Sequence, residues 1–120
     1  MNKPSINKYG LEIVALTLGL LLMMMMMPMA RAEDTVTLSI SLKDHRFQPA
    51  ELHAPAGKPI TIIVKNLDPT PAEFESNMLR VEKVITGGGT ITMRIRPLDP
   101  GRYRFFDDFH PETQGYLVVR

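Results

Sequence analysis

The chain has 120 residues, a mass of 13.5 kDa, a formal charge of +1 and no cysteine. This length suits one ordinary domain, and 44% hydrophobic with 22% charged residues is typical of a globular rather than a disordered chain. The lack of cysteine excludes thiol catalysis and disulfide cross-links. Five consecutive methionines at residues 23–27 set the N-terminal segment apart, so we expect this segment to have its own role.

Residues 1–32 follow the pattern of a secretory signal peptide. Lys3 and Lys8 make a positive start, residues 13–27 are almost entirely apolar, and Ala30-Arg31-Ala32 is a small-x-small triplet. The apolar stretch of 15 residues is shorter than the roughly 20 residues that a membrane-spanning helix needs. We therefore expect cleavage after this triplet and a periplasmic location, with an uncleaved membrane anchor as the alternative.

The exported domain would be residues 33–120, with 11 basic and 12 acidic residues and a net charge of about −1. It has no run of basic residues, so nucleic acid and anionic membrane surfaces are not expected partners. From these residues alone, contact with a membrane is expected only through an uncleaved signal.

Short runs of alternating apolar and polar residues in this domain predict half-buried strands. The clearest runs are residues 36–42, 60–64, 91–95, 103–105 and 117–119, and weaker ones are residues 51–54 and 79–85. Clusters of Pro, Gly and Asp lie between several of the runs and indicate turns. About seven short strands without a helical pattern predict an all-β Greek-key β-sandwich.

Residues 72–78 are the first of two predicted loops that carry chemistry. If this segment is extended, Glu73 and Glu75 point to one side while Phe74 points to the other and anchors in the core. The two carboxylates repel each other at this spacing, which favours a cation or solvent between them. A solvated acidic loop is the alternative interpretation.

The second predicted loop is residues 106–115, which contains an imidazole and three carboxylates: Asp107, Asp108, His110 and Glu112. This density of oxygen and nitrogen ligands suits a divalent or trivalent metal, and the set is compatible with copper(II), iron or manganese. A surface hairpin with ordinary charges is the alternative. Of the other histidines, His45 follows the first strand in a turn and is a second choice as a ligand, whereas His53 is expected to face water.

The order of short motifs in residues 35–120 resembles that of a cupredoxin domain. The motifs are Phe47-x-Pro49, Pro55-Ala56-Gly57-Lys58-Pro59, Val64-Lys65-Asn66, Pro100-Gly101-x-Tyr103-x-Phe105, His110 and Gly115-x-Leu117-x-Val119. Three further segments, residues 73–76, 79–85 and 109–113, resemble the cupredoxin-like proteins of bacterial periplasmic iron-uptake systems. This resemblance implies two partners, a high-affinity iron permease and a periplasmic iron-binding protein.

The sequence departs from the blue-copper pattern, which implies His, Cys, His and Met as ligands. At those four places this chain has Glu73 with Glu75, Asp107, His110 and Gln114. A blue-copper centre requires the thiolate, so this chain cannot form one. The iron-associated group usually has Gly-Glu before Phe-His, where this chain has Asp107-Asp108.

The sequence therefore predicts a metal-binding protein that assists iron uptake and holds copper or iron through Glu73, Glu75, Asp108 and His110. Second choices as ligands are Asp107, Glu112, Met78 and His45. Oxygen ligands favour iron(III) over iron(II), so oxidation of ferrous iron and simple metal handover both remain open. The alternatives are a non-catalytic interaction module that docks through its acidic loops, and a copper-sequestering protein.

Overall fold

The computed structural model describes residues 34–120, and the predicted signal peptide with its cleavage site lies outside the described residues. Within this range the chain forms nine strands and no helix, so no described helix could cross a membrane. The strands are β1 (Val36–Lys43), β2 (Arg46–Gln48), β3 (Glu51–Ala54), β4 (Ile60–Asn66), β5 (Ala72–Ser76), β6 (Val81–Ile85), β7 (Thr90–Ile95), β8 (Gly101–Asp107) and β9 (His110–Val119).

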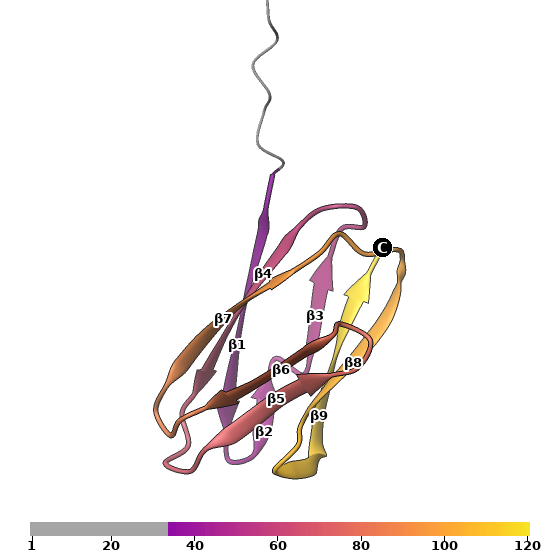
Figure 1. The fold of residues 1–120 in the computed structure, drawn as a ribbon. Coiled ribbons are helices and arrows are strands. Elements are labelled where there is room, and N and C mark those ends of the chain that lie inside the picture. Colours follow the sequence, from indigo (N-terminus) through magenta and orange to yellow (C-terminus); the bar gives the residue numbers. More distant parts are fainter. Residues whose placement is uncertain (1–33) are drawn as a thin grey trace, which may run out of the picture. The chain divides into compact units, whose positions relative to one another are not determined.

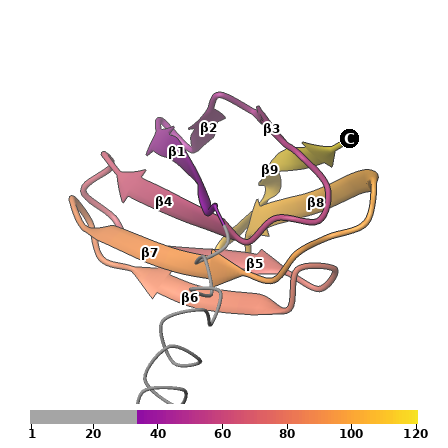
Figure 2. The same ribbon diagram turned by 90° about the horizontal axis from the view of Figure 1, so that it is seen from above.

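The strands form two packed sheets, which Figures 1 and 2 show from two directions. One sheet has the order β2-β1-β4-β7 and the other has the order β3-β9-β8-β5-β6. Both sheets are mixed, because β1 pairs in parallel with β4 and β3 in parallel with β9, while the other neighbours are antiparallel. The prediction of an all-β sandwich is thereby confirmed.

Three phenylalanines form the part of the core that lies nearest to the candidate metal ligands. Phe105 packs edge-on against Phe47 and is stacked with Phe74, with ring centroids 5.0 Å apart in each pair. All three side chains are buried. Phe47 is two residues from His45, Phe74 is next to Glu73, and Phe105 is two residues from Asp107. The packing of the core therefore fixes how these three candidate ligands leave the backbone.

The prediction of a loop is wrong for two segments of the chain. Residues 72–76 form strand β5, in which Phe74 is buried as predicted and Glu73 and Glu75 are partly exposed. The segment 106–115 is a tight hairpin, because β8 continues to Asp107 and β9 begins already at His110. A register shift at Phe106/Asp107 takes up the additional residues of β9. Charged side chains hid these strands: Glu73, Glu75 and Glu112 lie on the solvent side of the β-structure, whereas Asp107 is buried at the end of β8.

Candidate metal centre

His45 lies in the two-residue turn between β1 and β2. Both turn residues have positive φ, 50° at Asp44 and 55° at His45, as in a type I′ hairpin. The carboxylate of Asp68 accepts both turn N–H groups, at 2.7 Å from Asp44 and 3.0 Å from His45. The hydrogen bond from the His45 N–H is the main reason that the pKa of Asp68 is lowered, in spite of its burial.

Asp107 and His110 flank the turn between β8 and β9. The Asp107 side chain is 1% exposed, and its Oδ1 accepts the N–H groups of Glu73 at 2.9 Å and Phe109 at 3.0 Å. Its Oδ2 lies 3.4 Å from Nδ1 of His110. Both of these atoms are buried, and neither has a hydrogen-bond partner within residues 34–120.

These two unpartnered atoms fit a metal ion. They are close enough to form an ion pair when the imidazole is protonated, but neither makes a hydrogen bond, and a buried polar atom without one costs roughly 1–3 kcal/mol. Two ligand atoms that each lie about 2.0–2.1 Å from one ion at a tetrahedral angle are separated by roughly 3.4 Å. The observed separation of 3.4 Å between Asp107 and His110 matches this value.

His45 completes a group of three with these residues. His45, Asp107 and His110 each offer one ligand atom, and these atoms all lie within 4.8 Å of one another. The two imidazole rings are 4.1 Å apart at a tilt of 34°. The His45 and His110 side chains are 46% and 36% exposed, so the group is buried at Asp107 and open to solvent at its imidazoles. We call these three residues the two-histidine centre.

A second group consists of carboxylates alone. Ligand atoms of Glu73, Glu75 and Asp108 also lie within 4.8 Å of one another. A hydrogen bond with Glu82, followed by burial and the neighbouring negative charges, raises the pKa of Glu73 to about 7. Burial, followed by the charges of Asp108 and Glu82, raises the pKa of Glu75 as well. We call Glu73, Glu75 and Asp108 the carboxylate group.

The four ligands predicted from the sequence are thus divided between two groups. Glu73, Glu75 and Asp108 come together, while His110 belongs to the group with His45 and Asp107, which the sequence named only as second choices. The two groups are adjacent in space, since Asp107 and Asp108 are consecutive residues and the N–H of Glu73 donates to Oδ1 of Asp107 at 2.9 Å.

The remaining candidates lie outside both groups. Glu112 and Met78 are exposed, and Met78 retains 51% of its accessible surface. His53 is exposed as predicted and pairs with Glu51 at 3.1 Å.

The signal for His45 in the sequence was its position two residues before Phe47, the start of the first cupredoxin motif.

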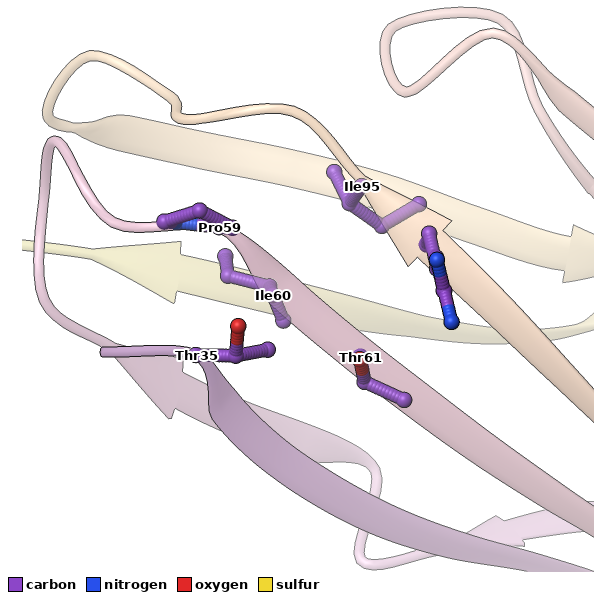
Figure 3. A pocket seen from close by; sticks show the side chains of 6 residues that line it. Thr35, Pro59, Ile60, Thr61 and Ile95 are labelled. Atoms are coloured by element: carbon purple, nitrogen blue, oxygen red, sulfur yellow. The ribbon is translucent and has the colours of Figure 1, made fainter. Parts of the chain in front are cut away.

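A hollow of about 380 Å³ lies at the opposite end of the four-stranded sheet (Figure 3). It is lined by Thr35, Pro59, Ile60, Thr61, Arg94 and Ile95. These residues include neither an imidazole nor a carboxylate, so the hollow does not offer the ligands of a metal site.

Comparison with known proteins supports the fold and the family. An uncharacterized protein of Rickettsia prowazekii (strain Madrid E) is 40% identical over 83 residues, which are 68% of this chain and 66% of that protein. This chain therefore spans slightly less than two thirds of that relative.

Solved structures of low identity share the fold. The metal-binding domain of the Cu(I)-exporting P-type ATPase CopA of Streptococcus pneumoniae D39 has a TM-score of 0.63 and 17% identity, covering 75% of this chain and 99% of that one. Auracyanin A, a blue copper protein from Chloroflexus aurantiacus, has a TM-score of 0.62 and 18% identity, covering 72% and 100%. The model of the cupredoxin-like domain matches residues 15–119, so this chain belongs to the cupredoxin-like domain family.

Proposed function

We propose that this protein binds a metal ion at the two-histidine centre, His45, Asp107 and His110. The observation that carries the proposal is the pair of buried, unpartnered atoms, Asp107 Oδ2 and His110 Nδ1, at a separation suited to two ligands of one ion. A bound cation would neutralise the buried carboxylate and satisfy both atoms together. The exposed edges of the imidazoles leave a route by which the ion enters.

Copper(II) and iron(II) are the ions that this donor set suits best. Two imidazoles with one carboxylate are ligands for both, and iron(II) is commonly held by two histidines and one carboxylate with open positions. Copper is also the metal named for the structural relatives, a Cu(I) exporter domain and a blue copper protein. Copper(II) outcompetes iron(II) at nearly any such site, so preference in vitro does not identify the metal carried in the cell.

The proposed role is in periplasmic iron uptake, beside a high-affinity permease and a periplasmic iron-binding protein. This role rests on the resemblance of residues 73–76, 79–85 and 109–113 to the cupredoxin-like proteins of such systems. The carboxylates Glu73, Glu75 and Asp108, together with His110, remain the ligands that the sequence predicts for copper or iron. Whether iron is oxidised or only handed over distinguishes an enzyme from a carrier.

A titration of the purified protein tests metal binding. Copper(II), and separately iron(II) without oxygen, is added to the wild type and to the variants His110→Ala and His53→Ala. His53 is the matched control, because it is an exposed histidine outside the centre. We expect one ion per chain in the wild type and in His53→Ala, and at least tenfold weaker binding in His110→Ala.

Two results would contradict the proposal or distinguish between its alternatives. Equal binding by wild type and His110→Ala would exclude the centre, and no stoichiometric metal in the wild type would favour the interaction module. Admitting air to the iron(II)-loaded protein then measures oxidation, in which each iron(II) loses one electron to dioxygen. Iron(III) formation no faster than in buffer would indicate a carrier rather than an oxidase.

A further inference from the structure

The backbone at His45 has an unfavourable conformation. Asp44 and His45 are consecutive non-glycine residues in the left-handed region, with φ of 50° and 55°. Such residues cost free energy relative to glycine at the same position, and they persist where their surroundings hold them. The turn that presents this imidazole therefore depends on groups elsewhere in the fold.

Asp68 holds the turn from the β4–β5 connection. Its carboxylate accepts the N–H groups of both turn residues, and the residue is only 7% exposed. Its own N–H donates to Oδ1 of Asn66 at 3.1 Å. The Asn66 side chain is fully buried and also donates to the carbonyl of Thr70 at 2.8 Å. These hydrogen bonds hold Asp68 in place independently of its contacts with the turn.

Thr113 holds the same turn from the other side. Its hydroxyl donates to the carbonyl oxygen of His45 at 2.6 Å, and the residue is 4% exposed. Thr113 lies on β9, three residues after His110. One strand therefore carries one imidazole and anchors the turn that carries the other.

Resting on the metal-binding function proposed above, we propose that Thr113 and Asp68 are positioning residues that hold His45 against His110 for a metal ion. Neither belongs to the two-histidine centre itself. Their effect is to keep the second imidazole in place before the ion arrives, so that binding does not have to order the turn. Groups that orient metal ligands in this way commonly contribute tenfold to a hundredfold in affinity.

Thr113→Val is the sharpest variant, since valine keeps the shape of threonine and removes its hydroxyl. Thr113→Ser restores the hydroxyl and is the rescue. Thr61→Val is the matched control, because Thr61 lies on β4 at the far end of the sheet, beside the hollow in Figure 3. Asp68→Asn, which removes the charge and one acceptor oxygen, tests the second anchor of the turn.

The probe is copper(II), with a competing chelator to measure affinity and electron paramagnetic resonance to count coordinated imidazole nitrogens. We expect Thr113→Val and Asp68→Asn each to bind copper(II) at least tenfold more weakly, with the signal of one imidazole in place of two. Thr113→Ser and Thr61→Val should resemble the wild type. In a His45→Ala background, Thr113→Val should cause no further loss, because its effect acts through His45.

The outcomes separate this proposal from the function on which it rests. If His110→Ala weakens binding but Thr113→Val and Asp68→Asn retain wild-type affinity and two nitrogens, the positioning role is wrong and the metal centre stands. A further loss from Thr113→Val in the His45→Ala background would also contradict it, since the effect would then be general destabilisation. If His110→Ala binds like the wild type, both proposals fall.

Discussion

Asp107 Oδ2 lies 3.4 Å from His110 Nδ1, and neither buried atom has a hydrogen-bond partner within residues 34–120. The other oxygen of the same carboxylate, Oδ1, accepts two backbone N–H groups. Asp107 therefore combines a structural atom, which fixes the hairpin, with a free atom that faces an imidazole. A substitution that keeps the acceptor at Oδ1 and changes only Oδ2 should therefore alter metal binding without destabilising the hairpin.

We predict that Asp107→Asn loses metal-dependent stabilisation without loss of metal-free stability. Asparagine keeps an acceptor at Oδ1, and its amide can donate to the His110 imidazole, while a buried charge disappears. The melting temperature without metal should stay equal or rise. The wild type should gain about 2.7 kcal/mol with copper(II) at a hundredfold excess over its Kd, and the variant should gain almost none. A full gain in the variant would remove Asp107 from the centre.

We predict that the copper(II)-loaded protein has only weak ligand-field absorption. Intense blue colour requires a thiolate ligand, and the chain has no cysteine. Asp107→Cys is the positive control, because Asp107 stands where the blue-copper pattern has its cysteine. Visible spectra of both proteins with one equivalent of copper(II) give the test. Intense blue absorption in the wild type would rule out the proposed ligands.

The pKa of Glu73 predicts a dependence of stability on pH. Its folded pKa of about 7 is above the ordinary value of 4.5, so between these values the folded state binds more protons than the unfolded state. This residue therefore makes the protein less stable as pH rises from about 4.5 to about 7. We expect Glu73→Gln to reduce that fall, measured as the melting temperature across the window. Glu112→Gln, at an exposed carboxylate outside both groups, should leave it unchanged.

Local patterns of the sequence were sufficient for most of the fold. The alternation around Ile62 and Val64 identified β4, and the burial of Phe74 between two glutamates followed from the period of a strand. Strand β2 was missed because three residues carry too little pattern. Strand β5 and the first part of β9 were predicted as loops because they carry charged residues. A charged residue marks the solvent-facing side of a strand, however, and not the end of the strand.

The candidate centre was less accessible to sequence reasoning because long-range contacts build it. The position of His45 depends on Asp68, which is 23 residues away, and on Thr113, which is 68 residues away. Neither contact has a local signature. Asp107 and Asp108 are neighbours with the same functional group, but one is buried beside His110 and the other is exposed beside Glu73. Only the strand pairing decides which carboxylate joins which group.

Processing of the N-terminus remains a prediction. If the triplet that ends at Ala32 is the cleavage site, the exported protein begins at Glu33. Intact-mass analysis of protein from both the periplasmic and the membrane fractions measures this directly. A mass that still includes residues 23–27 would instead indicate an anchored protein.

The last prediction decides whether one ion joins the two groups. The sequence placed Glu75 and His110 in one site, whereas in the structure they belong to the carboxylate group and the two-histidine centre respectively. We therefore expect His110→Ala to lose most of the copper(II)-dependent rise in melting temperature and Glu75→Ala to keep it, because imidazole is the better ligand for copper(II). The double variant should resemble His110→Ala. If Glu75→Ala alone loses as much as His110→Ala, and the double variant loses little more, a single ion is held by residues of both groups, and the four-ligand site predicted from the sequence is correct.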